Sequence, residues 1–222
     1  SCSVSNNDVS ASLYSKPASK HPPQIICFDD VKMEPFDLQI PSRVFNHWIN
    51  EKGPIVVAVS GGPDSMFLLH QLRIISKNKG KLIVVHLNHG LHATADQDAK
   101  YVRRYCDQYG IHYIERGIPV LFYSKKMGKS VELSGRILRR AFLAHFSRLY
   151  RAICVVTGHH LDDHVETFLM QLLRGAKSGL GRILDPSYYG DVMFLQPLST
   201  VSKDTILSFL DDQNIPHLLP YK

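Results

Sequence analysis

From Phe36 onward, short apolar runs alternate with longer segments in which apolar residues recur every three or four positions. The short runs are rich in β-branched residues, which is typical of strands buried on both faces of a sheet. They cover residues 55–59, 82–87, 111–114, 153–157 and 192–195. The longer segments predict helices over residues 41–49, 64–76, 95–109, 131–150, 161–174 and 202–212. This alternation predicts an α/β fold with a doubly wound, mostly parallel five-stranded sheet.

The first 35 residues differ in composition from the rest of the chain. They are rich in serine, contain several prolines, and hold few residues that could form a core. We expect a disordered tail over residues 1–35 and one folded domain over residues 36–222. The chain does not begin with Met, so two interpretations of the tail stay open: the remnant of an organelle-targeting peptide, or a plain boundary of the sequence.

Composition excludes two classes of protein. Apolar residues make up 44% and charged residues 21% of the 222 residues, so a buried core is expected and a fully disordered chain is excluded. No run of about 18 apolar residues occurs, which excludes a predicted membrane-spanning helix. The net charge of +6 favours polyanionic partners such as nucleic acid or nucleotides, although a solvated basic surface would give the same excess.

The four cysteines do not predict a metal site. Cys2, Cys27, Cys106 and Cys154 form no C-x-x-C pair, and their spacing matches no zinc or iron–sulfur pattern. Cys106 lies in a helical segment and Cys154 in an apolar run, so both are expected in the core. A reducing compartment is the default expectation.

The loop after the first predicted strand is the strongest candidate for a binding site. In doubly wound sheets, ligands bind at the carboxyl ends of the strands. Residues 60–65, Ser-Gly-Gly-Pro-Asp-Ser, follow the first strand and open a helix. Glycines allow a tight turn whose N–H groups approach an anion, and a helix N-terminus adds positive charge. The alternative is a simple strand-to-helix turn with a capping Asp.

Two further strand ends carry polar side chains. After the fourth strand, His159, Asp163 and Glu166 share one face if a helix begins near His159. Such a cluster suits magnesium binding, recognition of an ammonium group or proton transfer, although a solvated acidic helix start is the alternative. At the end of the second strand, His86 and His89 could be metal ligands, structural residues or neighbours of an adenine ring.

Three motifs resemble those of known enzymes. S-G-G-P-D-S is similar to the pyrophosphatase loop of the N-type ATP pyrophosphatases; it is neither a Walker loop nor a G-x-G-x-x-G fingerprint. The stretches H-L-N-H-G-L and G-H-H-L-D-D-H-V-E-T-F-L-M-Q-L-L-R-G-A-K-S-G-L resemble the tRNA(Ile)-lysidine synthase family, and the match spans residues 55–180. The resemblance implies an adenine nucleotide α-hydrolase-like domain of the PP-loop superfamily.

The same resemblance implies a carbon–nitrogen ligase. Enzymes of that family adenylate C2 of the wobble cytidine of tRNA(Ile) with a CAU anticodon, and free L-lysine then displaces AMP to give lysidine. ATP, magnesium, this tRNA and free lysine are therefore the expected cofactors and partners. No membrane partner is expected, a homodimer stays open, and an organellar location, a plastid above all, is expected with the cytoplasm as the alternative.

The family's site residues carry over to matching positions. ATP binding is implied for Ser60, Gly61, Gly62, Pro63, Asp64, Ser65, His86, Asn88, Arg136, Arg139 and Gly158. Catalysis is implied for Asp163, His159 and Glu166, and substrate binding for His160, Asp162 and Arg174. Asp64 and Asp163 are the expected magnesium ligands. Planar guanidinium groups such as those of Arg136 and Arg139 suit phosphate oxygens, although they could also belong to a solvated basic helix face.

The chain also departs from the family's pattern. Arg140 stands where the family usually has Tyr, Gly135 where it has Ala, and Gln196 where it has Arg. The family's later Asp-x-Ser/Thr-Asn element and its C-terminal tRNA-binding domains do not follow. We therefore expect a truncated form, a fragment or a member of reduced activity. Two alternatives stay open: a tRNA 2-thiolation enzyme, for which a C-x-x-C pair is lacking, and a catalytically impaired module that binds nucleotide or RNA.

Overall fold

The computed structural model describes residues 36, 38–50, 52–76, 81–89, 95–160 and 186–212. All of them belong to one compact unit, residues 33–222. The expected tail over residues 1–35 and the expected helix over residues 161–174 lie outside the described residues, so both stay predictions. None of the helices in the described ranges is long and apolar enough to cross a membrane.

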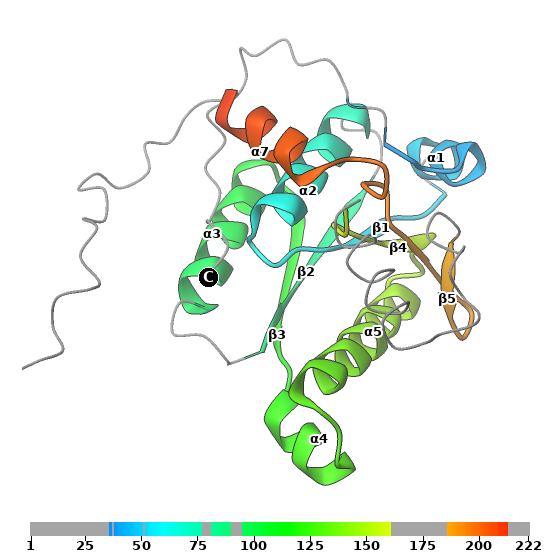
Figure 1. Cartoon of the computed structure of the whole chain (residues 1–222). Coiled ribbons are helices and arrows are strands. Elements are labelled where there is room, and N and C mark those ends of the chain that lie inside the picture. The colour runs from blue at the N-terminus through cyan, green and yellow to red at the C-terminus, as the bar shows by residue number, and fades with distance from the viewer. Residues whose placement is uncertain are drawn as a thin grey trace, which may run out of the picture. The chain divides into compact units, whose positions relative to one another are not determined.

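Strands and helices alternate along the described chain, and Figure 1 shows their arrangement. In chain order the elements are α1 (Ser42–Ile49), β1 (Ile55–Ala58), α2 (Pro63–Ser76), β2 (Leu82–Asn88), α3 (Ala95–Gln108), β3 (His112–Gly117), α4 (Val120–Met127), α5 (Val131–Leu149), β4 (Cys154–Thr157), β5 (Ser187–Tyr189), β6 (Val192–Leu195) and α7 (Lys203–Asp212).

The sheet confirms the predicted fold class and corrects its strand count. The strand order is β3-β2-β1-β4-β6-β5, and every neighbouring pair is parallel except β5 with β6. The prediction of five strands was wrong because it missed β5, which forms a hairpin with β6 through Gly190 at φ +63°. The β5 sequence Ser-Tyr-Tyr is half-exposed to exposed, so it lacks the apolar pattern by which the other strands were found.

One short helix was also missed. Helix α4 buries only Val120, while Leu121, Phe122 and Met127 face solvent. Its apolar residues therefore do not form the stripe that predicts a helix packed on a core. The other predicted elements within the described residues agree with the structure to within a few residues, the largest difference being at β3, which extends through polar Glu115 and Arg116 to Gly117.

Helices cover both faces of the sheet. In Figure 1, α2, α3 and α7 lie on one side of the strands and α5 lies on the other. The α5 side holds a continuous apolar core in which Leu143, Ala144 and Phe146 of α5 meet Val56, Val85, Val155 and Phe194 of the strands. On the other side, Phe67 of α2 packs edge-to-face against Phe209 of α7, with ring centroids 5.0 Å apart.

The strand order reverses between β1 and β4, which places the ligand-binding edge. From β1 the chain proceeds to β2 and β3 on one side, and from β4 to β6 on the other. The registers set Ala58 beside both Val85 and Thr157. The residues that follow these three positions therefore emerge together at the carboxyl edge, where sheets of this kind bind ligands.

Buried His70 makes folding stability depend on pH. Its Nδ1 lies 2.9 Å from the Tyr105 hydroxyl, and burial, helped by Arg73, lowers the pKa of His70 to about 4. The unfolded chain takes up a proton near pH 6.5 and the folded chain does not until about pH 4, so stability is full above the unfolded pKa and is lost as pH falls.

We expect the free energy of unfolding to fall by about 2 kcal/mol between pH 7.5 and pH 5 because of His70 alone. Urea unfolding of the wild type and of His70→Gln at both values measures this. The variant should lose less stability than the wild type over the interval, and identical losses in the two proteins would contradict the prediction.

Candidate active site

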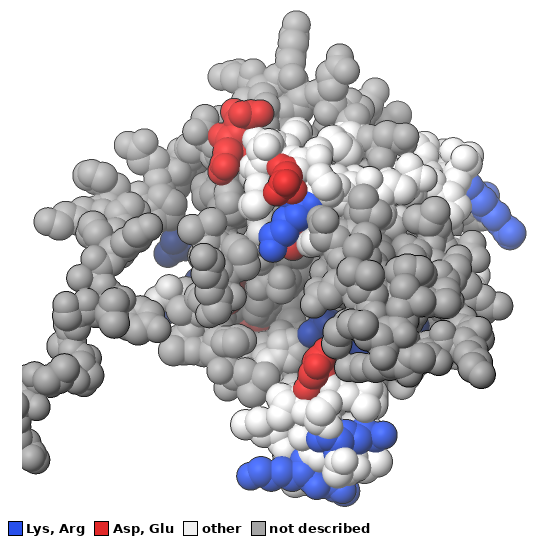
Figure 2. Space-filling view, viewed as in Figure 1, with Lys and Arg blue, Asp and Glu red and all other residues white. Residues whose placement is uncertain are grey.

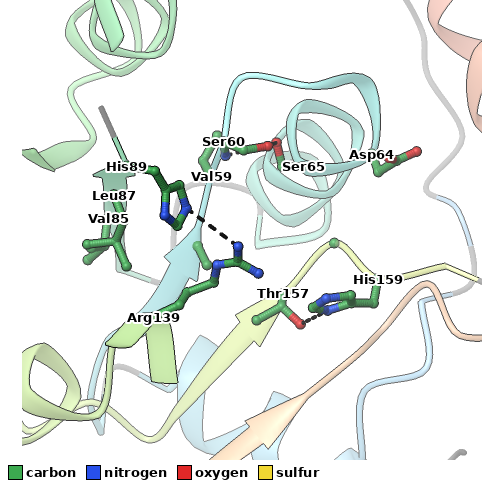
Figure 3. A pocket seen from close by; sticks show the side chains of 12 residues that line it. Val59, Ser60, Asp64, Ser65, Val85, Leu87, His89, Arg139, Thr157 and His159 are labelled. Carbon is green, nitrogen blue, oxygen red and sulfur yellow. Dashed lines mark hydrogen bonds between the residues drawn. The ribbon is translucent and has the colours of Figure 1, made fainter. Parts of the chain in front are cut away.

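A pocket of about 260 Å³ opens where the carboxyl ends of β1, β2 and β4 meet (Figure 3). Its polar residues stand at or just after the carboxyl ends of these three strands and at the start of α2, and α5 contributes an arginine. It is lined by Ala58, Val59, Ser60, Asp64, Ser65, Val85, Leu87, His89, Arg139, Thr157, Gly158 and His159. The pocket thus lies at the strand-order reversal.

The turn over residues 60–65 is held in shape by its own serines. Gly61 has φ +95°, a conformation that favours glycine, and α2 begins at Pro63, which lacks the N–H that a first helical residue would leave unbonded. The Ser65 hydroxyl donates to the Gly62 carbonyl at 3.0 Å and accepts from the Ser60 N–H at 3.2 Å. The turn is therefore held by its own hydrogen bonds, with the N-terminus of α2 at the pocket.

Gly158 allows the end of β4 to touch this turn. A Cβ placed at Gly158 would lie 3.0 Å from both the N and Cα of Ser65 and 3.1 Å from the carbonyl carbon of Asp64. These are backbone atoms of α2, so they cannot move aside without displacing the helix start. The close approach brings Thr157 and His159 to the pocket, with Thr157 Oγ1 2.9 Å from His159 Nδ1.

Helix α5 supplies the positive charge of the pocket. Its N-terminus is capped by Ser130, whose hydroxyl accepts from the Leu133 N–H at 3.2 Å. Two turns later Arg139 reaches the pocket, and its guanidinium donates to Nε2 of His89 at 3.4 Å (Figure 3). Burial and the charge of nearby Arg136 lower the pKa of Arg139, which nevertheless stays protonated. A half-buried cation beside another cation favours an anionic ligand.

The remaining wall is apolar. Val85 and Leu87 of β2 join Ala58, the last residue of β1, and the following Val59 at the pocket. Ligand sites of this kind combine an apolar wall with a few polar groups that fix orientation. An apolar wall next to a preformed anion-binding turn can hold a planar base together with its phosphates.

The structure brings together part of the predicted site. Six predicted residues line the pocket, namely Ser60, Asp64, Ser65, Arg139, Gly158 and His159. Gly61, Gly62 and Pro63 belong to the same turn without lining the pocket, and the predicted residues Asp162, Asp163, Glu166 and Arg174 lie outside the described residues.

Other predicted residues lie away from the pocket lining. His86 is buried with Nδ1 2.9 Å from the Val59 carbonyl, because alternation along β2 sends its side chain to the face opposite Val85 and Leu87. Neither Asn88 nor exposed Arg136 lines the pocket. His160 is buried and does not line the pocket, but its Nε2 lies 3.8 Å from Oδ1 of Asp64, which does.

Sequence reasoning did not select Thr157, a polar residue of the pocket, and it left open whether His89 is a metal ligand, a structural residue or a neighbour of an adenine ring. A signal was present for both. Thr157 is the last residue of β4 and His89 is the first residue after β2, so both stand at carboxyl ends of central strands.

Asp64 is the only expected magnesium ligand among the described residues. Within those residues, no group of three or more His, Cys, Asp or Glu side chains is placed to hold a metal ion. The Asp64 carboxylate lines the pocket at the start of α2, and a carboxylate is the oxygen ligand that magnesium prefers. A single carboxylate suits a magnesium ion that phosphate oxygens would coordinate for the most part. Among the described residues, no set of protein ligands surrounds such an ion.

Gly135, where the resemblance led us to expect Ala, leaves room for a methyl group. A Cβ there would lie 3.7 Å from Cγ1 of Val120 and 3.9 Å from the His89 ring, which is ordinary contact. Because glycine costs about 1 kcal/mol more than alanine in a helix interior, we expect Gly135→Ala to stabilise the protein by about that amount. Thermal unfolding should show a melting temperature higher by about 3 °C, and a lower one would contradict the geometry of this contact.

Comparisons with known proteins place the chain in a family. The family model described as "PP-loop domain" matches residues 37–218. The chain is 35% identical over 163 residues to tRNA(Ile)-lysidine synthase of Lactiplantibacillus plantarum, covering 72% of this chain and 36% of that protein. It is 34% identical over 171 residues to the enzyme of the same name from Petrotoga mobilis, covering 76% and 54%. The chain thus spans between about a third and about half of these relatives' length.

Solved structures share the fold at low identity. The U34-tRNA thiolase NcsA from Methanococcus maripaludis, a protein with a 4Fe–4S cluster, superposes with a TM-score of 0.64 at 20% identity, covering 81% of this chain and 66% of that one. The NH3-dependent NAD synthetase from Campylobacter jejuni gives 0.53 at 16% identity, covering 78% and 70%. At such identities the likeness is one of fold.

Proposed function

The chain belongs to the PP-loop domain family, and we propose that it catalyses the reaction of a tRNA(Ile)-lysidine synthase. The relatives named above support the proposal, since they match most of this chain at about a third identity. Because the chain spans only part of their length, the substrates and the complete reaction are assigned here as a proposal. In it, ATP adenylates C2 of the wobble cytidine of tRNA(Ile), and free L-lysine displaces AMP.

One observation carries the proposal: the serine–glycine turn, Arg139 and the apolar wall of β1 and β2 enclose a single pocket. The turn and the start of α2 would hold the triphosphate by N–H and hydroxyl groups. Arg139 would neutralise phosphate charge, and the apolar wall would take the adenine ring. Such a pocket performs catalysis by holding the reactants in place and neutralising charge.

In the first step, the cytidine O2 attacks the α-phosphorus of ATP. The new O–P bond forms as the bond from the α-phosphorus to the bridging oxygen breaks, and diphosphate leaves with that electron pair. The N–H and hydroxyl donors of the turn would lower the barrier, because they are already held in place when negative charge builds up on the phosphate oxygens. A magnesium ion held by the phosphates and Asp64 would neutralise part of the charge on diphosphate.

In the second step, the ε-amine of lysine attacks C2 of the adenylated cytidine. The C–N bond forms, the C2–O bond breaks, and AMP leaves with the electron pair while the amine loses a proton. His159 is the described residue placed to take part, because its ring lies in the pocket wall and its Nδ1 is fixed 2.9 Å from Thr157 Oγ1. The resemblance implies catalytic roles for Asp163 and Glu166 as well, around the metal, the lysine or the reacting centre.

The described cysteines weigh against the thiolation alternative. Sulfur transfer needs a reactive thiolate or a cluster ligand near the nucleotide. Burial raises the pKa of both Cys106 and Cys154 to about 12, and neither residue lines the pocket. Both thiols therefore stay protonated inside the core of the protein.

Supplying the protein with ATP, magnesium and tRNA(Ile) tests the assignment. Labelled lysine is added in one reaction and a sulfide donor in a second, and the modified nucleoside is identified by mass spectrometry. The proposal expects lysidine in the first reaction only. A thiolated cytidine would establish the alternative, and tRNA binding without release of AMP would identify an impaired relative.

A further inference from the structure

Helix α4 exposes an apolar and basic surface that its packing does not explain. Leu121 is 52% exposed, Phe122 66% and Met127 49%, while three exposed lysines lie among them. We call this set the α4 surface: Leu121, Phe122, Lys125, Lys126, Met127 and Lys129. Apolar residues gathered on an exposed face mark contact with another molecule more often than isolated ones do.

The α4 surface has a defined shape. Phe122 and Lys126 are one turn apart on the helix, and the Lys126 ammonium lies 5.9 Å from the centre of the Phe122 ring. Gly128, at φ +59°, ends the helix. The Ser124 hydroxyl donates to the Lys129 carbonyl at 2.6 Å, and the Lys129 N–H donates to the Ser124 carbonyl at 3.1 Å. These bonds fasten the backbone of Lys129 to the end of α4.

The charge of the α4 surface is not neutralised within its own segment. No Asp or Glu occurs between Arg116 and Val131. Figure 2 shows Lys and Arg side chains grouped over the part of the molecule that α4 occupies in Figure 1. Three ammonium groups with an exposed aromatic ring among them are complementary to a polyanion that also carries planar, stackable bases.

The α4 surface lies at the same edge of the sheet as the pocket. The Ile118 N–H, just before α4, donates to the Asn88 carbonyl at the end of β2 at 2.9 Å. Gly135 of α5 lies against both Val120 of α4 and His89, and His89 lines the pocket. The first residue of α4 is thus linked to the pocket wall through Gly135 and His89.

We propose that the α4 surface binds single-stranded RNA next to the nucleotide that enters the pocket. The lysines would contact phosphates, and Phe122 would stack on an unpaired base, as aromatic residues do when they bind single strands. This inference rests on the proposed function, because it takes RNA to be the substrate. The inference adds to the proposed function that α4 is the helix that holds the RNA beside the pocket.

A double variant tests the lysines. Lys125→Ala/Lys126→Ala removes two charges from the α4 surface, and Lys52→Ala/Lys81→Ala removes two exposed charges near the amino ends of β1 and β2, at the opposite edge. Binding of tRNA(Ile) is measured across a range of salt concentrations for the full chain. We expect the α4 variant to bind about tenfold more weakly and its log–log salt slope to fall by roughly 1.5. The control should change less than twofold.

A separate variant tests the aromatic ring. Phe122→Leu keeps an apolar side chain but cannot stack on a base. We expect about tenfold weaker binding at every salt concentration with an unchanged salt slope, because no phosphate contact is lost. Affinity for ATP should be unchanged in all three variants, since none of the substituted residues lines the pocket.

The outcomes separate this inference from the proposed function. Lysidine formation with RNA affinity unchanged in the α4 variants would overturn the inference and leave the function standing. Weakened RNA binding in a protein that forms no lysidine would support the inference and reject the function. If the α4 variants lose affinity for anionic lipid vesicles and keep affinity for RNA, the surface binds membranes and the inference is wrong.

Discussion

Gly158→Ala should reduce ATP-dependent release of diphosphate by about tenfold. The added Cβ would stand 3.0 Å from backbone atoms of Ser65, tighter than nine in ten such contacts, so the start of α2 must shift away from β4 by a few tenths of an ångström. A displacement of about 1 Å at a site that works by positioning costs about 100-fold in rate, so this smaller shift should cost about tenfold. Steady-state assay of diphosphate release, with the affinity for ATP measured separately, gives the size of the effect.

The matched control is Gly135→Ala, a second glycine-to-alanine change beside the same pocket, where the Cβ has room. We expect this control to retain activity. We also expect Gly158→Ala to lower the free energy of unfolding by about 1–3 kcal/mol, as overpacking of a buried contact does, while the protein still folds. Full activity in folded Gly158→Ala would show that the contact between β4 and α2 does not set the site.

Arg139→Gln should produce a second large loss, about a hundredfold in the efficiency of ATP use. The Arg139 side chain is half-buried and directed into the pocket beside His89. A charged hydrogen bond of this kind contributes about 1.5–3 kcal/mol, and a planar guanidinium that contacts two phosphate oxygens contributes more. Kinetics at varied ATP concentration should show the loss mainly as weaker binding of ATP.

Arg140→Gln is the control for charge, since it alters the next residue of the same helix. The Arg140 guanidinium donates to the Tyr188 carbonyl at 3.0 Å and lies 4.8 Å from the centre of the Phe194 ring. It therefore fastens α5 to the β5–β6 hairpin and does not line the pocket. We expect a loss of about 1 kcal/mol in stability with activity retained. Equal kinetic losses in both variants would contradict the role assigned to Arg139.

Local chemistry allowed part of the site to be predicted from the sequence. The turn over residues 60–65 could be found because glycines, serines and a helix start are consecutive in the chain. The central strands could be found because burial on both faces requires nearly continuous apolar runs. In each of these cases, the physical cause acts between residues that are close in sequence.

What was missed depends on contacts between residues far apart in sequence. Thr157 was not selected and the role of His89 stayed open, because only the strand registers that align Ala58 with Val85 and Thr157 bring these strand ends to one pocket. His86 was selected with its motif, yet side-chain alternation along β2 directs it to the face of the sheet opposite Val85 and Leu87, away from the pocket. The β5 strand was missed because it is a polar edge held by its hairpin partner.

The arrangement separates two tasks along one edge of the sheet. The preformed turn and Arg139 form a site suited to a nucleotide, and the α4 surface adds charge and an aromatic ring beside it. The pocket and the α4 surface share no residues. A substitution in one should therefore leave binding at the other intact. The variants of Gly158 and of Lys125 and Lys126 should therefore give opposite patterns of ATP and RNA affinity.

The identity of the nucleotide products tests the central assignment. The protein is incubated with tRNA(Ile), lysine, magnesium and ATP that carries distinguishable labels on its α- and γ-phosphates. If the turn over residues 60–65 directs attack at the α-phosphorus, AMP and diphosphate will form in equal amounts, one of each for every lysine joined to RNA. Formation of ADP and inorganic phosphate would contradict that account.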